Sequence, residues 1–468
     1  DLNSKDQTGY TTITENFYGE WEAFKNFRIR ARFGLTAQKN SSDIFKPASH
    51  TDYASISVNS DDYLLRGEYT KAQGSQMSLS ADIGAAYAIE VNKHLLYTNL
   101  SWTIEEANSE TTSNTAVGFP SDRMDFISFG NGYKVGSKPT GSESTTRSAG
   151  LVLSANYSYD NRYLADLSYR LNGSSQFGAD ERWGNFWSLG TSWRIDREEF
   201  MASTSDWLSA LTLKMSYGAQ GNDNLGTYYA SKGLYSIVSN LGENALVSDR
   251  MATPNLKWET NLNFNLGMDF SLFNNRFSGS FDFFTRRSKD LLYSRPIAPS
   301  LGYGFIDENV GALKNTGIEL VLNGTVINQN GWVWKLGMNL THYKNKVTEL
   351  PLKDMPQSGV NKLQVGRSVY DFYMKEWAGV DPDNGKPLWY ADELDADDNP
   401  TGKRVTTSDY ASADYYYVNK SSLPKVYGGF NTSLSWKGFD LSAIFAYSIG
   451  GYIYNRDITM ILHNGSLE

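Results

Sequence analysis

The stretch NLNFNLGMDFSLFNNRFSGSFDFF, residues 261–284, alternates apolar and polar side chains almost without interruption. The even positions from 262 to 272 hold only Leu, Phe and Met, whereas the odd positions between them hold Asn, Gly, Asp and Ser. Because successive side chains of a strand point to opposite faces, this pattern predicts two strands, each with one apolar and one polar face. Asn274 and Asn275 separate the strands and suit a tight hairpin turn, since Asn tolerates a positive φ.

Two kinds of protein use such hairpins. In a soluble sandwich, the apolar face packs against a second sheet. In a membrane barrel, the apolar face meets lipid and the polar face lines a water-filled lumen. The rest of the chain has to decide between them.

The composition favours the barrel. Of the 468 residues only 40% are hydrophobic, yet 14% are aromatic, including 30 Tyr and 12 Trp. A soluble protein of this length normally has more Leu, Ile and Val for its core, whereas a wet barrel needs only an outer apolar band and aromatic girdles. No segment approaches the roughly 18 consecutive apolar residues of a transmembrane helix. The absence of Cys excludes disulfides and thiolate sites, and the net charge of -9 argues against a nucleic-acid partner.

The alternating segments form about fourteen predicted strands, whose connections are alternately short and long. The predicted short turns are centred on Lys25-Asn26, Asn92-Lys93, Asp160-Asn161, Asn274-Asn275, Gln329-Asn330 and Lys437-Gly438. The predicted long connections are residues 39–74, 110–143, 172–183, 220–256, 286–312 and 346–423. An intermediate connection, residues 196–210, is predicted to hold a short helix.

This segregation of loop lengths is typical of outer-membrane barrels, which place short turns in the periplasm and long loops outside the cell. Aromatic residues near predicted strand ends fit the girdles of such barrels. They are Trp332, Trp334, Trp436 and Phe439. We therefore predict an all-β fold, an antiparallel transmembrane β-barrel in the bacterial outer membrane.

One block, residues 162–201, has the sequence RYLADLSYRLNGSSQFGADERWGNFWSLGTSWRIDREEFM. It resembles the Arg-Tyr, Gly-Ser-Ser-x-Phe-Gly and Arg-Trp-Gly pattern of SusC/RagA-type TonB-dependent transporters of Bacteroidetes-like bacteria. Further blocks similar to that family follow in the family's order, at residues 213–230, 254–270, 309–327, 377–390 and 423–451. The blocks cover residues 150–455, and residues 1–150 fit the family by strand pattern alone.

The resemblance implies active import of nutrients, typically oligosaccharides and sometimes oligopeptides. In such a system the ligand binds between the barrel loops and a SusD-like surface lipoprotein, and TonB then remodels a plug domain. Because large plugged barrels have about 22 strands, we expect residues 1–468 to form part of the barrel domain. The plug, the segment that contacts TonB and about eight strands are expected outside this chain.

Two alternatives remain open from the sequence. The first is a passive porin, or a TonB-dependent receptor for metal chelates. A plug with a TonB-interacting segment would exclude the passive porin. The second is a soluble, secreted β-rich binding protein, which would behave as a soluble monomer without detergent.

The best candidate binding residues are aromatic side chains of the long connections, because aromatic faces stack on sugar rings or peptide side chains at low entropic cost. The alternative for each is that it packs loops together or belongs to the outer girdle. The candidates for ligand or partner binding are Trp183, Tyr228, Tyr229, Tyr303, Phe305, Trp377, Trp389 and Tyr390.

No catalytic residue or cofactor is predicted. The four histidines, His50, His94, His342 and His463, are scattered without metal-ligand spacing, and no Gly-x-Ser-x-Gly nucleophile elbow occurs. In the acidic segment 379–402, the carboxylates of Asp395, Asp397 and Asp398 are weak candidates for a calcium site. An exposed acidic loop without a metal is the commoner explanation of such a segment.

Overall fold

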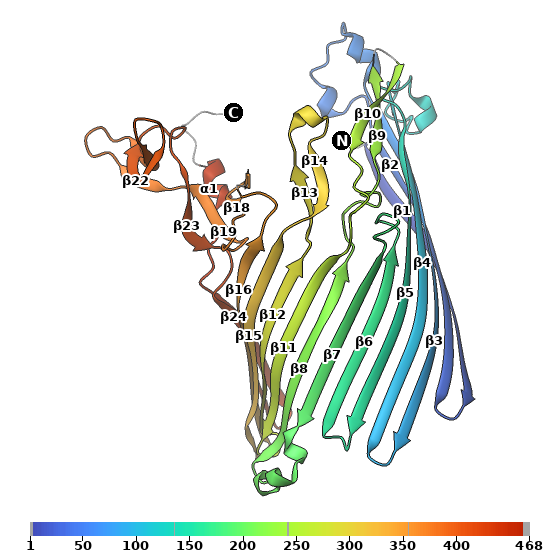
Figure 1. Cartoon of the computed structure of the whole chain (residues 1–468). Coiled ribbons are helices and arrows are strands. Elements are labelled where there is room, and N and C mark those ends of the chain that lie inside the picture. Colours follow the sequence, from blue (N-terminus) through green and yellow to red (C-terminus); the bar gives the residue numbers. More distant parts are fainter. Residues whose placement is uncertain (1–2, 135, 241–242, 354, 462–468) are drawn as a thin grey trace.

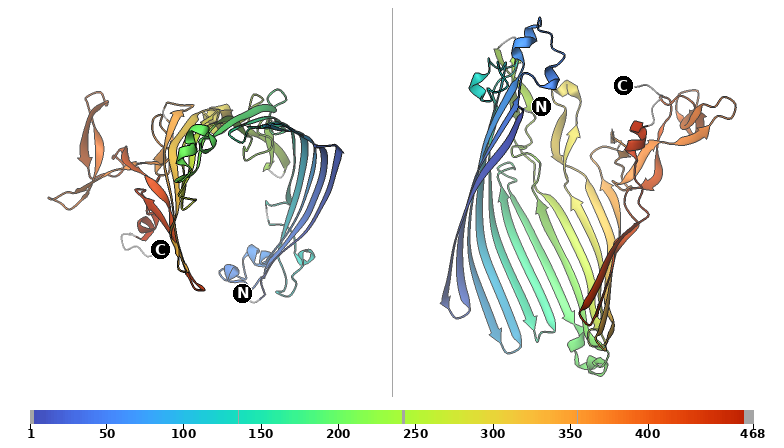
Figure 2. Two further views of the ribbon diagram at one scale, coloured as in Figure 1. Left: turned by 90° about the horizontal axis from the view of Figure 1, so that it is seen from below. Right: turned by 180° about the vertical axis from the view of Figure 1, so that it is seen from behind.

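The computed structural model describes residues 3–134, 136–240, 243–353 and 355–461. Its main feature is one antiparallel sheet of 14 strands, which curves into an open arc (Figures 1 and 2). The strands are β1 (Lys5–Phe24), β2 (Phe27–Lys46), β3 (Glu68–Val91), β4 (His94–Val117), β5 (Thr140–Tyr159), β6 (Tyr163–Ser174), β7 (Trp183–Arg194), β8 (Leu208–Asn222), β11 (Glu259–Leu272), β12 (Phe277–Lys289), β15 (Ala312–Gln329), β16 (Trp332–Glu349), β24 (Val426–Trp436) and β25 (Phe439–Ile449). The predicted all-β fold is confirmed.

The strands follow one another through the sheet in chain order, so that every neighbour is an antiparallel hairpin partner. Within the described residues, β1 and β25 are the two edge strands, and each pairs on one side only. Figure 2, seen from below, shows the opening of the arc between them.

The short turns lie together at one end of the sheet (Figure 1). Lys25-Asn26, Asn92-Lys93 and Lys437-Gly438 are two-residue turns, as predicted. Two predictions were wrong in detail. Asn330-Gly331, and not Gln329-Asn330, joins β15 to β16, with φ of 54° and 79°. The opening hairpin turns over residues 273–276, because Phe273 also adopts a positive φ of 52° and Arg276 N closes the turn on the Phe273 carbonyl.

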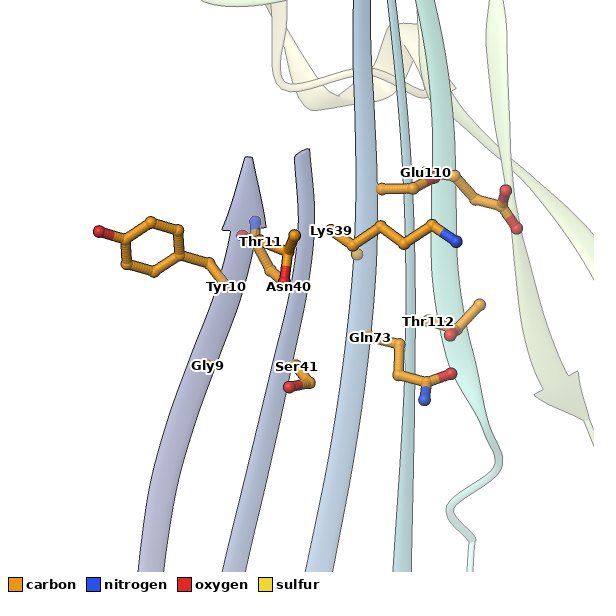
Figure 3. A pocket seen from close by; sticks show the side chains of 11 residues that line it. Gly9, Tyr10, Thr11, Lys39, Asn40, Ser41, Gln73, Glu110 and Thr112 are labelled. Atoms are coloured by element: carbon orange, nitrogen blue, oxygen red, sulfur yellow. The ribbon is translucent and has the colours of Figure 1, made fainter. Parts of the chain in front are cut away.

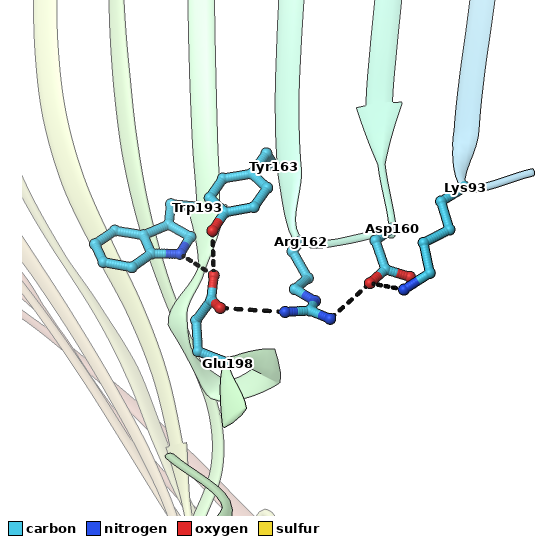
Figure 4. A network of polar contacts seen from close by, with 6 residues as sticks. All are labelled: Lys93, Asp160, Arg162, Tyr163, Trp193 and Glu198. Atoms are coloured by element: carbon cyan, nitrogen blue, oxygen red, sulfur yellow. Dashed lines mark hydrogen bonds and ion pairs between the residues drawn. The ribbon is translucent and has the colours of Figure 1, made fainter. Parts of the chain in front are cut away.

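A polar network along the same rim links the β3–β4 turn, the β5–β6 turn and the connection after β7 (Figure 4). The carboxylate of Asp160, which follows β5, forms ion pairs with Lys93 at 2.9 Å and with Arg162 at 2.7 Å. Arg162 also contacts Glu198, at 3.2 Å, in the connection after β7. Glu198 further accepts hydrogen bonds from the Tyr163 hydroxyl and from the Trp193 indole, at 2.6 and 2.9 Å. The network therefore fixes the rim across β3 to β8.

The connection after β7 contains only short 3-10 helices, which confirms the predicted helical segment in part. The helices of the structure are η1 (Thr51–Tyr53), η2 (Asp61–Leu65), η3 (Ile127–Phe129), η4 (Ile195–Arg197), η5 (Glu199–Thr204), η6 (Pro299–Leu301) and the α-helix α1 (Arg456–Ile461). In the part of the chain that the structure describes, no helix has the length and apolar character needed to cross a membrane.

The long connections gather at the opposite end of the sheet (Figure 1). The connection after β2 is shorter than predicted, because β2 continues to Lys46 and β3 begins at Glu68. The connection after β4 is also shorter, because β4 continues to Val117 and β5 begins at Thr140. Three of the long connections form small sheets of their own. Their strands are β9 (Leu234–Asn240), β10 (Glu243–Arg250), β13 (Leu292–Pro296), β14 (Phe305–Asn309), β17 (Gln357–Ser358), β18 (Asn361–Lys362), β19 (Asp371–Lys375), β20 (Trp377–Val380), β21 (Pro387–Leu394), β22 (Pro400–Thr407) and β23 (Tyr415–Ser421).

One face of the large sheet carries a continuous apolar band. Cross-strand partners share a face, and Leu266 pairs with Met215 on β8 and with Phe283 on β12. The band is exposed, with Leu100, Trp102 and Leu266 between 45 and 48% exposed. In a soluble sandwich a second sheet would cover this face. Within the described residues no second sheet covers it, as expected of the lipid-facing side of a barrel.

The opposite face is polar. Lys214 on β8 contacts Asp269 on β11 at 2.8 Å and Asp282 on β12 at 3.7 Å. These side chains meet across Gly267, where an added Cβ would lie 2.2 Å from an Asp282 carboxylate oxygen. The missing side chain thus allows the ion pairs to form, and the polar face suits a water-filled lumen.

Beyond the apolar band, β1 to β4 continue toward the long connections with polar residues on both faces. Lys39, Ser75 and Glu110 are partners on the face that carries the band lower down, and Asn40 and Thr111 lie on the other face. Figure 3 shows a shallow pocket of about 590 Å³ in this region. A strand segment that is polar on both faces lies outside the hydrocarbon core of a membrane.

Aromatic pairs border the band at the turn end, as predicted for a girdle. Trp332 and Trp436 stack at 4.7 Å between ring centroids, and Phe24 and Phe27 stack at the same distance. Both pairs flank short turns, which places the aqueous boundary of the band at this rim.

Candidate binding surface at the long connections

A buried cluster holds several long connections together. Phe177, Ala230 and Leu256, from the connections after β6 and β8, are each at most 1% exposed, and Trp258 packs against them. The Trp258 ring lies 5.3 Å from that of Phe177, and its indole donates a hydrogen bond of 2.9 Å to the Arg182 carbonyl. This part of the loop end is therefore a packed scaffold.

Two predicted binding residues belong to the scaffold. The Tyr229 hydroxyl accepts a 3.0 Å hydrogen bond from the backbone N–H of Thr145 on β5. Phe305, the first residue of β14, has the Arg250 guanidinium over its ring at 5.6 Å. Arg250 also pairs with the buried carboxylate of Asp307 at 2.9 Å, which ties β10 to β14. For these two residues the structure favours loop packing.

Three other candidates are dispersed. Trp183 is the first residue of β7 and pairs with Gly173, which in turn pairs with Ala149. All three lie on the face that carries the apolar band. The position of Trp183 is that of an upper girdle residue. Tyr228 is exposed and Tyr303 half-buried, each in a different connection. The structure does not bring these three side chains together.

Two of the three remaining candidates do come together. Trp377 and Trp389 lie opposite one another on β20 and β21, with ring centroids 5.7 Å apart in an edge-to-face arrangement. Tyr410 completes the group, because its ring lies 5.1 Å from that of Trp389 and the Lys375 ammonium stands 4.4 Å over it. Trp377 is 55% and Tyr410 53% exposed. We call Trp377, Trp389 and Tyr410 the aromatic patch.

The other face of this small sheet packs inward. Arg404, the partner of Asp392, lies 3.8 Å over the Tyr416 ring and 5.8 Å over the Tyr390 ring. The Tyr416 hydroxyl donates a 2.8 Å hydrogen bond to Asp392. Burial and that bond raise the pKa of Tyr416 above its usual range. Tyr390 thus supports the sheet from behind, and the aromatic patch remains open.

Tyr410, Tyr416 and Arg404 were not predicted from the sequence. Tyr410 and Trp389 are far apart in the chain, and only the folding of the connection brings them together. The alternating segment 387–394, with a turn before 400–407, is the one sequence signal that could have indicated this hairpin.

The acidic residues of this connection organise its turn. Asp395 accepts hydrogen bonds from the backbone N–H groups of Asp397 and Asn399, at 2.9 and 3.0 Å. These bonds hold the pKa of the Asp395 carboxyl below its usual range. Asp395, Asp397 and Asp398 do not converge on a common point, and the described ranges contain no group of three or more carboxylate or histidine side chains placed to hold a metal.

The connection that carries the aromatic patch stands to the side of the arc. In Figures 1 and 2, the segment with β19, β22 and β23 projects away from the concave side. The β9–β10 hairpin lies instead on the concave side in Figure 2. The aromatic patch is therefore a surface beside the barrel mouth and not a lining of the lumen.

Comparison with known proteins agrees with this architecture. Residues 1–456 match the family described as TonB dependent receptor-like, beta-barrel. The chain belongs to the TonB-dependent receptor β-barrel family. It is thus part of an outer-membrane barrel of a receptor family and not an enzyme, as the sequence predicted.

Individual relatives place it with the SusC/RagA type of TonB-dependent receptor. TonB-dependent receptor P3 of Formosa agariphila is 26% identical over 97% of this chain and 46% of its own length. TonB-dependent receptor SusC of Bacteroides thetaiotaomicron is 31% identical over 64% of this chain and 31% of its own length. The structure of the RagAB peptide importer in the closed-closed state has a TM-score of 0.86 and 28% identity, covering 98% of this chain and 49% of that chain. The chain thus spans about half or less of the relatives that it matches.

Proposed function

We propose that this TonB-dependent receptor barrel is the wall and loop region of an active importer for oligomeric nutrients, either oligopeptides or oligosaccharides. The observation that carries the proposal is the match of nearly the whole chain, with its 14-strand arc, to a barrel in the RagAB peptide importer. The relation to SusC supports the same mode of import. The polar concave face would line the path, and TonB would supply the driving force.

A SusD-like surface lipoprotein is the proposed partner, and the aromatic patch is its proposed contact. Exposed apolar groups that cluster beside a binding mouth are typical of protein interfaces, where Trp, Tyr and Arg carry much of the binding energy. The patch stands beside the arc, where it can hold a lid without blocking the lumen. This location favours partner binding over direct ligand binding for Trp377 and Trp389.

The energy requirement tests the import proposal directly. Cells that carry the protein should take up labelled oligopeptides or oligosaccharides, and uptake should stop when TonB is depleted or the proton gradient is collapsed. A passive porin would continue to equilibrate the same probes. Uptake that survives both treatments would therefore reject active import.

The composition of the native complex provides the second readout. Extraction from outer membranes in mild detergent, followed by mass spectrometry of the intact complex, should reveal a lipidated partner with a bound peptide or glycan. The bound oligomer would name the substrate class. A protein that carries no lipoprotein after such extraction would contradict the proposed partner.

A further inference from the structure

The lipid-facing side of the sheet contains a second concave site. A pocket of about 780 Å³ lies where the apolar band ends below the long connections. Its floor follows one row of cross-strand partners, with one residue on each strand from β2 to β7. The row is Phe33, Ala81, Ile104, Ala149, Gly173 and Trp183.

Small residues create the hollow in this row. Between the larger side chains of Phe33 and Trp183, Ala81 and Ala149 lie on either side of Ile104. The Trp183 ring lies flat over Gly173, where an added Cβ would be 2.9 Å from the ring. The hollow is continuous with the band that meets lipid, so the apolar part of its occupant is hydrocarbon.

Cationic and hydroxyl groups border the hollow on the side of the long connections. One row above it, Arg147 donates from Nε to Glu106 at 2.7 Å, yet its side chain is 67% exposed. In the part of the chain that the structure describes, no residue accepts a hydrogen bond from the two terminal amino groups of Arg147. Lys232 is exposed, forms no ion pair with a described carboxylate, and stands 5.8 Å from the Tyr229 ring centroid.

These groups match a phosphate. A guanidinium with free N–H groups binds phosphate oxygens in a planar fork, and an ammonium adds a second positive charge. Tyr229 accepts a bond from the Thr145 backbone and keeps its own proton to donate. Two carboxylates, Glu105 and Glu106, line the pocket together with three cations, Arg147, Arg182 and Lys232, so positive charge exceeds negative charge by one. Glu106 is paired with Arg147.

We propose that this pocket binds a phosphorylated glycolipid of the outer leaflet. One acyl chain would lie in the hollow over Ala81 and Ala149, and a phosphate would be bound by Arg147, Lys232 and the Tyr229 hydroxyl. Basic groups at the headgroup level with an adjoining apolar groove are the chemistry that recognises an anionic lipid. Trp183 sits at the headgroup boundary, as girdle residues do. The site is independent of the import path on the other face.

The test titrates the protein, purified in mild detergent, with diphosphorylated lipid A and counts bound lipid by native mass spectrometry. Arg147→Gln with Lys232→Gln removes two charges, which should weaken binding on the order of 30-fold. Ala149→Phe keeps the charges but fills the hollow and should abolish acyl-chain binding. The two variants attack separate parts of the site, so misfolding of one does not decide the question.

Each variant has a matched control. Arg123→Gln with Lys134→Gln removes two exposed charges from the connection after β4. Ala155→Phe adds the same ring on the same strand and face, lower in the band. Both controls should bind lipid A as the unchanged protein does. Lipid A that lacks phosphates should bind weakly, and inorganic phosphate alone should not compete.

Three results would overturn the proposal. The first is an unchanged protein that retains no lipid A. The second is equal loss in the variants and their controls. The third is binding that ignores the phosphates, which would indicate a nonspecific apolar contact.

Discussion

Trp377 and Trp389 show how two residues create a surface that neither would form alone. Trp389 contacts both Trp377 and Tyr410, the Lys375 ammonium lies over Tyr410, and Trp377 and Tyr410 are exposed. Changing Trp377→Ala together with Trp389→Ala should weaken retention of the surface lipoprotein by more than about 1 kcal/mol, because aromatic groups dominate such interfaces. The amount of lipoprotein that co-purifies with the barrel measures this effect.

Tyr133→Ala is the control for the double Trp variant. Tyr133 lies in the connection after β4 and is 51% exposed, similar to Trp377 at 55%. Tyr133→Ala should leave the complex intact. Full retention of the lipoprotein by the double Trp variant would contradict the proposed contact, and a selective loss of bound oligomer would assign the patch to the ligand.

At the scale of elements, the turn network around Glu198 connects hairpins that share no loop (Figure 4). Hydrogen bonds from Tyr163, Trp193 and Arg162 hold the pKa of Glu198 below its usual range. A carboxyl with a lowered pKa stabilises the fold above its unfolded pKa and loses this effect as pH falls through its folded pKa. Thermal stability in detergent should therefore fall below about pH 4.5, and Glu198→Gln should flatten that part of the profile.

The neighbouring Glu199 is the matched control, because it is exposed and is the first residue of the 3-10 helix η5, whose N-cap is Glu198. Glu199→Gln should preserve both the melting temperature at neutral pH and the acid-dependent loss. An unchanged profile for Glu198→Gln would show that the network does not contribute to rim stability.

At the scale of the whole molecule, a single strand runs from the lipid-facing apolar band into the polar region beyond it, on the same face of the sheet. On β3, Ile83 lies in the apolar band and Gln73 lies among polar partners beyond it (Figure 3). Residues 1–468 contain no Cys, so an introduced thiol is the only one in this part of the protein. In intact cells, Gln73→Cys should react with a membrane-impermeant maleimide, whereas Ile83→Cys should not.

A spin label at the same two positions supplies the control for local structure. The label at Ile83→Cys should be accessible to oxygen, which partitions into lipid, and the label at Gln73→Cys to a water-soluble nickel chelate. Equal accessibility of the two labels would mean that the membrane boundary does not lie between them.

Loop architecture lay largely beyond the reach of the sequence. Tyr229 and Phe305 have the composition of binding residues, yet their partners, Thr145 and Arg250, come from distant segments. Trp183 was assigned to a connection, but strand register places it on the lipid-facing row. Trp377 and Trp389 were two of the eight separate candidates, and the structure brings their rings into contact. Tyr410 was missed because no local pattern predicts a contact across a folded loop.

The sequence by itself determined the strands, the turns and the two faces of the wall. Alternation is a local property, because each side chain points opposite to its neighbour whatever the rest of the chain does, and Asn and Gly mark the turns through their own backbone preferences. The tertiary structure alone decided which aromatic side chains pack, which stay open and where small residues hollow the lipid-facing row. Those outcomes depend on register and on contacts between distant segments, and loops carry no period that would encode them.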